Sequence, residues 1–281
     1  MKKFNIRQAL GLEKKSRQAI ADSMTIEEKR LYILNDNTPF QIKEAYKALR
    51  TNILFSLPEE HSNKIIITSS MASEGKSTTC VNTAISFAET NKKVIIVDCD
   101  LRRPNIANLL DIPQKPGLSN VLVRMSDLKS AIRKNVRENL DALVSGEIPP
   151  NPSELLDSAR MREVIETLSQ EYDYVFIDTP PVLAVTDTAI LTKYCSGVLL
   201  LAHYNQTDRG AVSEAVEQLR LANAKILGGI FNGVETDGEG KYKRRGYYRY
   251  GRYGSYGKGY GYGYGYGYGY GEHKNSEESD K

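Results

Sequence analysis

The sequence predicts an α/β fold in which a mostly parallel sheet is covered by helices on both faces. Six short apolar runs alternate with amphipathic stretches long enough to form helices. Runs that are apolar throughout are typical of strands buried on both faces, and strand–helix alternation favours a parallel arrangement. Polar residues suited to binding phosphate or metal follow three of these runs. Ligands of open α/β sheets bind at the carboxyl ends of the strands, so we expect a site there.

The predicted elements follow one another along the chain. From Pro39, apolar residues recur at helical spacing to about residue 56, which predicts an amphipathic helix. Asn151 as N-cap, Pro152 at the first helical position and Glu154 predict a capping box at the start of a later helix. The predicted strands are 64–70, 93–98, 141–146, 173–178, 197–203 and 225–234, and the other predicted helices are 77–89, 154–169 and 210–224.

Composition divides the chain into three parts, an N-terminal extension (1–37), an α/β domain (38–237) and a tail (238–281). The tail alternates glycine with tyrosine from Tyr260 to Tyr270. Glycine has no side chain to pack and loses the most backbone entropy on ordering, so we expect a flexible tail rather than a strand. Three uses remain open: adhesion, nucleic-acid binding by stacked phenols, or phosphorylation.

Charge, cysteine spacing and the lack of apolar segments in the sequence indicate the cellular compartment. The net charge of +3 is modest, and the three cysteines have no disulfide-framework spacing, which indicates a reducing cytoplasm. The sequence shows neither a secretory signal nor a long apolar run. Any work at a membrane is therefore expected to depend on a partner.

The turn after the first predicted strand has the features of a phosphate loop. Such a loop needs inward backbone N–H groups, a glycine that lets the chain approach the phosphates, a lysine for their charge and a hydroxyl for Mg²⁺. Gly75, Lys76 and Ser77 supply the last three. Ser70 stands where the strict pattern has its first glycine. Placed between a strand and a helix, this turn predicts a nucleotide site and a P-loop NTPase-like fold.

Carboxylates follow two further strands. Asp98 ends the second predicted strand, Asp100 follows two residues later, and Asp178 ends the fourth. Carboxylates at such positions can hold hydrated Mg²⁺ and accept a proton from a hydroxyl. Together with the lysine loop they predict a site for phosphoryl transfer or nucleotide hydrolysis.

These segments resemble the Walker A, A′ and B motifs of the bacterial tyrosine kinases that accompany capsule and exopolysaccharide export. The matching segments are SSMASEGKS, VIIVDCDLRRP and VFIDTPP, and the resemblance covers about residues 39–234. GEIPPNPSELL resembles another segment of the family. Ala72 and Ser73 depart from it, since the commoner loop has proline and glycine there. The family ends in a tyrosine cluster that the enzyme phosphorylates, here Tyr242, Tyr247, Tyr248, Tyr250, Tyr253, Tyr256, Tyr260, Tyr262, Tyr264, Tyr266, Tyr268 and Tyr270.

The resemblance implies roles for individual residues. Lys76 would contact the β- and γ-phosphates of ATP, and Asp98 would take the proton from the incoming tyrosine. Arg102 matches the arginine of the A′ motif, and Asn232 lies where related folds present an amide to adenine, although each could equally be structural. Mg²⁺ would be held by Ser77, Asp100 and Asp178, and phosphate oxygens by the amides of Ser73, Glu74, Gly75, Lys76, Ser77 and Thr78.

The resemblance also implies partners. The family pairs subunits in a ring through a Glu-x-x-Arg-x-x-Arg segment, whose positions are Glu44, Lys47 and Arg50 here. Residues three apart lie near one helical face, so these charges are expected to point together at a neighbour. An ordinary solvated helix face is the alternative. The family further implies a membrane-embedded adaptor that holds the enzyme at the inner face of the membrane, protein tyrosine substrates and a phosphotyrosine phosphatase, with no nucleic acid.

Two other functions remain open. A ParA/MinD-type ATPase shares the sheet and the A′ aspartates, but carries a signature lysine where this chain has Met71. A nucleic-acid-binding or adhesive protein acting through the tail would have an ancillary ATPase. Loss of binding at raised salt would support this second alternative.

Overall fold

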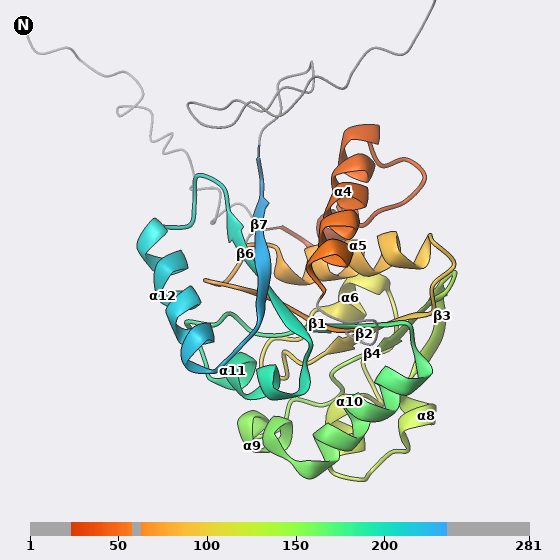
Figure 1. Cartoon of the computed structure of the whole chain (residues 1–281). Coiled ribbons are helices and arrows are strands. Elements are labelled where there is room, and N and C mark those ends of the chain that lie inside the picture. The colour runs from red at the N-terminus through yellow and green to blue at the C-terminus, as the bar shows by residue number, and fades with distance from the viewer. Residues whose placement is uncertain (1–23, 58–62, 235–281) are drawn as a thin grey trace, which may run out of the picture. The chain divides into compact units, whose positions relative to one another are not determined.

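The computed structural model describes residues 24–57 and 63–234, and in this part of the chain a seven-stranded sheet forms the centre. Its order is β3-β4-β2-β5-β1-β6-β7, and every neighbouring pair is parallel except β3 and β4 (Figure 1). The predicted mostly parallel sheet is confirmed. The strands are β1 (Lys64–Ser69), β2 (Val94–Asp98), β3 (Arg133–Arg137), β4 (Leu140–Leu143), β5 (Tyr174–Asp178), β6 (Gly197–His203) and β7 (Ile226–Asn232).

Helices cover both faces of the sheet, with α5 and α6 over one face and α9 and α10 over the other (Figure 1). Successive residues of a strand point to opposite faces, so Ile65 and Ile67 pack toward α5, while Ile66 packs toward α10. All three are fully buried. The helices are α3 (Ile26–Arg30), α4 (Phe40–Ser56), α5 (Lys76–Ala88), α6 (Ile106–Leu110), α7 (Leu118–Leu122), α8 (Leu128–Ala131), α9 (Pro152–Asp157), α10 (Ala159–Glu171), α11 (Asp187–Leu191), the 3₁₀ turn η1 (Thr192–Tyr194) and α12 (Arg209–Leu221).

The expected helix at 154–169 is divided in two. It breaks at Ser158, which has extended backbone angles and whose hydroxyl accepts a hydrogen bond from the Met161 N–H at 3.1 Å. Asn151 does occupy the N-cap position of α9, but its side chain makes no capping hydrogen bond, so the predicted capping box is wrong. A serine that caps a second helix competes with continuation of the first one.

The segment before α4 belongs to the domain, which corrects the boundary drawn at residue 37. Ile33 and Leu34 are 3% and 5% exposed and belong to the same core cluster as the buried side chains of α5. Asn82 of α5 fixes this segment, because its side chain accepts from the Leu34 N–H at 2.8 Å and donates to the Tyr32 carbonyl at 2.8 Å. The expected tail (238–281), and the extension up to residue 23, lie outside the described residues.

Candidate active site

The site lies where β1, β2 and β5 end, next to one another in the sheet. Asp98 and Asp178 are paired across β2 and β5, and the loop that follows β1 leads directly into α5. Three sequence segments that are far apart in the chain therefore meet at one edge, as the sequence predicted.

The phosphate loop has a backbone shape that depends on Gly75. This residue has a φ of 91°, in the left-handed region, and a Cβ there would lie 2.3 Å from the Asn232 Nδ2 atom. Ser73, which replaces the family's glycine, also has a positive φ of 63°. The helix α5 begins immediately after Gly75, so that its first N–H groups face this turn. Ser73, Glu74, Gly75, Lys76, Ser77 and Thr78 thus form one continuous turn into a helix.

Lys76 lies at the centre of the site, surrounded by oxygen atoms. Its Nζ is 2.8 Å from Asp100 Oδ2, 3.4 Å from Asp178 Oδ2 and 3.2 Å from Ser77 Oγ. Ser77 in turn donates to Asp178 Oδ2 at 2.6 Å. Burial alone would lower the pKa of Lys76, but the charges of Asp178 and Asp100 outweigh it and raise the pKa above its ordinary value. The ammonium is therefore firmly held in its charged form.

Asp178 retains an unused acceptor. Its Oδ1 atom is buried and has no hydrogen-bond partner within the described protein, whereas Oδ2 binds both Ser77 and Lys76. Burial raises the pKa of this carboxyl. Buried polar atoms are usually paired, so an unpaired carboxylate oxygen at a strand end is suited to a ligand.

Asp98 is fully buried and binds backbone amides. Its Oδ1 accepts from the Asp100 N–H at 3.2 Å, and its Oδ2 accepts from the N–H groups of Asn105 and Ile106 at 3.2 and 3.1 Å. Burial, followed by the charge of Asp178, raises the pKa of Asp98 to about 8. Asp98 therefore has a high affinity for a proton, and it also fixes the loop between β2 and α6, a role that the sequence did not reveal.

Arg102 and Asn232 are both engaged with the protein. Arg102 forms a two-pronged contact with the buried carboxylate of Asp187, at 2.8 and 3.1 Å, and also donates to Ser153 Oγ at 2.9 Å. The Asn232 amide donates to the Glu74 carbonyl at 2.9 Å and accepts from the Gly233 N–H at 2.9 Å. These contacts agree with the alternative in which Arg102 and Asn232 are structural residues. Asn232 also contacts the phosphate loop, through the Glu74 carbonyl.

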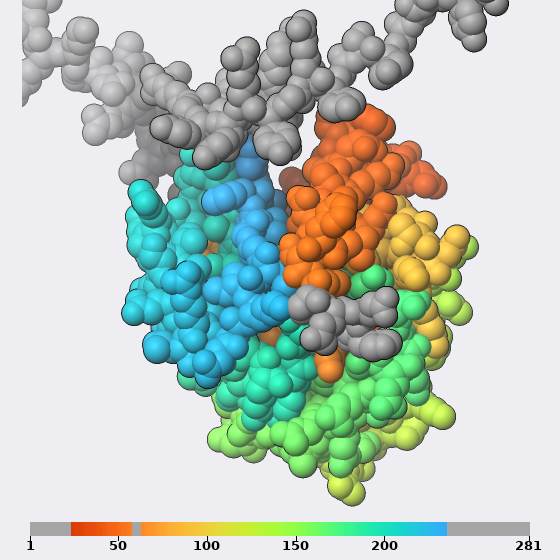
Figure 2. All heavy atoms as spheres, viewed as in Figure 1, coloured from red at the N-terminus to blue at the C-terminus, as the bar shows by residue number. Residues whose placement is uncertain are grey.

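The charges on α4 do not all point the same way. Lys47 and Glu44 form an ion pair at 2.8 Å on the exposed side of the helix. Arg50 instead turns toward α5, where it donates to the Ser86 carbonyl and to Ser86 Oγ. The helix stands out as the orange ridge in Figure 2, and Phe40 and Phe55 on it are 71% and 86% exposed.

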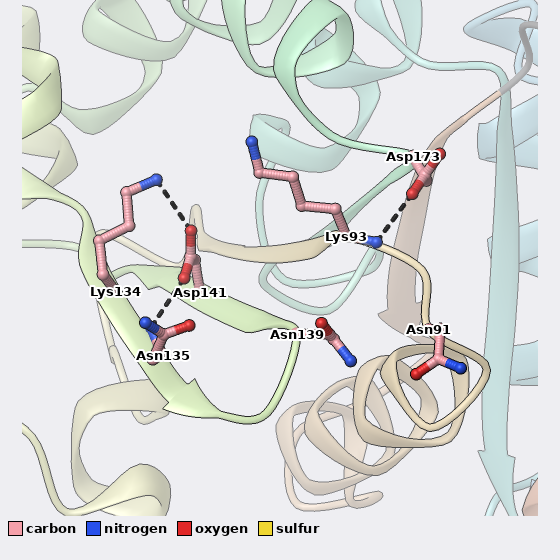
Figure 3. Close-up of a pocket in the computed structure, with 7 residues that line it drawn as sticks. All are labelled: Asn91, Lys93, Lys134, Asn135, Asn139, Asp141 and Asp173. Carbon is pink, nitrogen blue, oxygen red and sulfur yellow. Dashed lines mark hydrogen bonds and ion pairs between the residues drawn. The ribbon is translucent and has the colours of Figure 1, made fainter.

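A pocket of about 390 Å³ lies away from this site. It is lined by residues at the amino ends of β2, β4 and β5 and by the β3–β4 hairpin, namely Asn91, Lys93, Lys134, Asn135, Asn139, Asp141 and Asp173 (Figure 3). Parallel strands place their amino and carboxyl ends at opposite edges of a sheet. The pocket is therefore separate from the phosphate loop.

Comparison with known proteins identifies the class. A family model described as an AAA domain matches residues 62–222, which includes the phosphate loop and all three aspartates. The chain is thus a nucleotide-binding protein with a P-loop NTPase-like fold. A plasmid partition protein of Borrelia burgdorferi shares the fold with a TM-score of 0.50 at 24% identity, covering 60% of this chain and 78% of that one. The septum site-determining protein MinD of Pyrococcus horikoshii has a TM-score of 0.52 at 26% identity, covering 59% and 68%.

More similar relatives identify the family. The tyrosine-protein kinase YwqD of Bacillus subtilis is 38% identical over 205 residues, which cover 73% of this chain and 85% of YwqD. The putative tyrosine-protein kinase CapB of Staphylococcus aureus is 33% identical, covering 79% of this chain and 95% of CapB. The kinase domain of the Escherichia coli tyrosine kinase ETK has a TM-score of 0.68 at 31% identity, covering 83% and 91%. The chain belongs to the bacterial tyrosine kinases.

Proposed function

We propose that this enzyme transfers the γ-phosphoryl group of ATP to tyrosines of its own C-terminal tail, in support of capsule or exopolysaccharide synthesis and export. One observation carries the proposal: Lys76, Ser77, Asp100 and Asp178 converge within hydrogen-bond or ion-pair distance beside a glycine turn that opens a helix. The twelve tail tyrosines lie outside the described residues.

The site residues fit a magnesium ion bound with the nucleotide. Ser77, Asp100 and Asp178 supply the hard oxygen ligands that Mg²⁺ prefers, and Asp178 Oδ1 has no hydrogen-bond partner among residues 24–57 and 63–234. The described residues contain no group of three or more His, Cys, Asp or Glu side chains suited to a metal. Two carboxylates and one hydroxyl instead surround the Lys76 ammonium, so Lys76 would move to the phosphates when Mg·ATP binds. The metal would neutralise charge that develops on the phosphates.

In this scheme the residues divide the work of transfer. Amides from Ser73 to Thr78 hold phosphate oxygens, and Lys76 contacts the β- and γ-phosphates. The tyrosine oxygen attacks the γ-phosphorus as the bond from that phosphorus to the β–γ bridging oxygen breaks, and ADP leaves. Asp98, with its raised pKa, receives the phenolic proton.

The proposed protein partners are inferred from the family and not from contacts within the structure. No described helix is both long and apolar enough to cross a membrane. We propose that a membrane-embedded adaptor of the polysaccharide system places the enzyme at the inner face of the membrane, and that a phosphatase removes the phosphates. We also propose a ring-shaped homo-oligomer in which tails are exchanged between subunits. The exposed phenylalanines of α4 and the Glu44–Lys47 pair favour that helix as a contact surface.

The test is phosphate mapping by mass spectrometry after incubation with Mg·ATP, with and without candidate adaptor fragments. Phosphate on tail tyrosines in the wild type and none in Lys76→Met is expected, with Lys92→Met, an exposed lysine, as the matched control. Asp98→Asn should retain a larger fraction of the wild-type nucleotide affinity than of the wild-type rate of phosphate transfer. Unlabelled wild type together with salt-sensitive binding of nucleic acid would favour the tail-binding alternative.

A further inference from the structure

The carboxylate of Glu74 is buried in the phosphate loop without a counter-ion. Glu74 is 2% exposed, and no Lys, Arg or His among the described residues forms an ion pair with it. A buried charge needs hydrogen bonds to offset its lost hydration. A negative charge beside a polyphosphate site also repels the ligand, and more strongly the closer the carboxylate comes to the phosphates.

Two donors hold this carboxylate. The Met71 N–H donates to Oε2 at 3.1 Å, which closes the loop on itself, and the Thr207 hydroxyl donates to Oε1. Thr207 lies in the segment between β6 and α12 and is 133 positions away in the sequence. It is therefore the one side-chain donor to this carboxylate in the described chain.

Thr207 is itself fixed on β6. Its Oγ1 accepts from the His203 N–H at 2.8 Å, and its own N–H donates to the His203 carbonyl at 2.9 Å. Because the His203 N–H can only donate and a carboxylate can only accept, the hydroxyl proton is directed to Glu74. The end of β6 thus sets the position of the carboxylate.

The peptide bond after Glu74 is fixed from the other side. Asn232 donates to the Glu74 carbonyl, and in a trans peptide the following N–H, that of Gly75, points the opposite way. Side chain and main chain of Glu74 are thus both anchored to neighbouring strand ends. This arrangement orients the amides before any phosphate arrives.

We propose that Thr207 is a positioning residue for ATP binding: its hydroxyl holds the Glu74 carboxylate so that the phosphate loop is pre-organised. The inference rests on the proposed binding of ATP at this loop. Without the hydroxyl, the carboxylate is free to turn toward the phosphates and the Met71–Glu74 closure loosens. Both effects weaken nucleotide binding, although Thr207 does not touch the nucleotide.

The test compares Thr207→Val, which keeps the shape but loses the hydroxyl, with Thr207→Ser, which keeps the hydroxyl. The dissociation constants for ADP and a non-hydrolysable ATP analogue are measured by calorimetry. Thr207→Val should weaken both about tenfold, the effect of one hydrogen bond to a charged group, and Thr207→Ser should stay within about twofold of wild type. Thr167→Val is the control, because the Thr167 hydroxyl donates to the Glu163 carbonyl of its own helix, away from the phosphate loop.

A double-mutant cycle with Glu74→Gln separates this role from general stability. If Thr207 acts through the carboxylate, Thr207→Val should weaken nucleotide binding much less in the Glu74→Gln background than in the wild type. Equal losses in both backgrounds, wild-type affinity in Thr207→Val, or failure of serine to restore affinity would each overturn the inference. Failure of the wild type itself to bind nucleotide would overturn the proposed function instead.

Discussion

At the scale of the residue, the ammonium of Lys76 lies between two buried carboxylates. A cation bound together with the nucleotide would need this same position. Asp100 and Asp178 are 3% and 0% exposed, and Lys76 forms an ion pair with each of them. A buried carboxylate left without a partner destabilises a protein by about 3–5 kcal/mol. Lys76 thus stabilises the nucleotide-free fold in addition to its role with phosphates.

We expect Lys76→Met to unfold at lower temperature than the wild type and to be rescued by divalent metal. In this variant a metal ion can replace the missing positive charge between Asp100 and Asp178. Thermal unfolding with and without Mn²⁺, in the absence of nucleotide, measures the effect. Mn²⁺ should raise the unfolding temperature of Lys76→Met more than that of wild type or of Lys92→Met, and equal shifts in all three would contradict this view.

At the scale of the element, the sequence indicated strands well where both faces are buried. β1, β2 and β5 each contain a run of consecutive apolar residues, because their side chains pack into the core on both faces of the sheet. The strand β3 was missed because RKNVR lies at the sheet edge and is largely solvent-accessible, so neither an apolar run nor strict alternation marks it. The short helices α6, α7 and α8 have too few turns for a periodic signal.

The site was predictable to the extent that its residues belong to local motifs. Gly75, Lys76 and Ser77 are consecutive, and Asp98, Asp100 and Asp178 follow apolar runs, so their chemistry was visible in the sequence. Thr207 was not, because its contact with Glu74 depends on β6 lying beside β1, and no local pattern records strand order. Ile33 and Leu34 were missed because the apolar run LYIL to which they belong is too short to show a periodicity.

The junction between the segment before α4 and the helix α5 depends on Asn82. This side chain is 1% exposed and binds Leu34, Tyr32 and the Tyr46 hydroxyl. Asn82→Ala should lower the free energy of unfolding by about 3 kcal/mol, because it leaves buried backbone groups unpaired. Urea unfolding measures this, with the exposed Asn52→Ala as control; an unchanged free energy would mean that the segment docks without Asn82.

The β3–β4 hairpin supplies a pH-dependent contribution. Burial alone would raise the pKa of Asp141, but hydrogen bonds from Tyr172, the Asn135 N–H and Lys134 outweigh it, and the pKa is lowered. A lowered folded-state pKa contributes stability above the unfolded value of about 3.9, and this contribution is lost as the pH falls through the folded value.

Asp141→Asn should therefore be less stable than wild type at pH 7 by about 1–2 kcal/mol, the scale of a hydrogen bond to a charged group. The difference should shrink as the pH falls below 4. Urea unfolding at several pH values gives the comparison, and Glu138→Gln, at an exposed position of the same hairpin, serves as control. A difference that stays constant across this range would argue against a charge effect.

At the scale of the whole molecule, α4 has two different faces. Arg50 attaches it to α5, while Glu44 and Lys47 stay on the exposed side with Phe40 and Phe55. The three charges that the sequence grouped together therefore separate into one internal contact and one external pair. Substitution of all three residues would therefore combine two effects, one on the packing of α4 against α5 and one on the association of subunits.

The double variant Glu44→Ala/Lys47→Ala should form smaller particles by light scattering and phosphorylate its tail more slowly, with unchanged unfolding. Arg50→Ala alone should mainly lower the unfolding temperature, because it removes the contact with Ser86. The exposed Gln41→Ala is the control on the same helix. An unchanged particle mass and unchanged tail labelling in the double variant would mean that the Glu44–Lys47 pair is an ordinary solvent-exposed ion pair without a role in assembly.

The contact between Asn232 and Glu74 has a practical consequence for shortening the chain. Asn232 is the last residue of β7, two positions before the described part of the chain ends, and its amide is braced by the Gly233 N–H. A truncation after Phe231 would keep every proposed catalytic residue and yet remove the anchor of the phosphate loop. A truncation after Val234 would remove the tail and leave that anchor in place. Tail-free enzyme prepared for inhibitor screening or phosphorylation of added substrates should accordingly stop no earlier than residue 234.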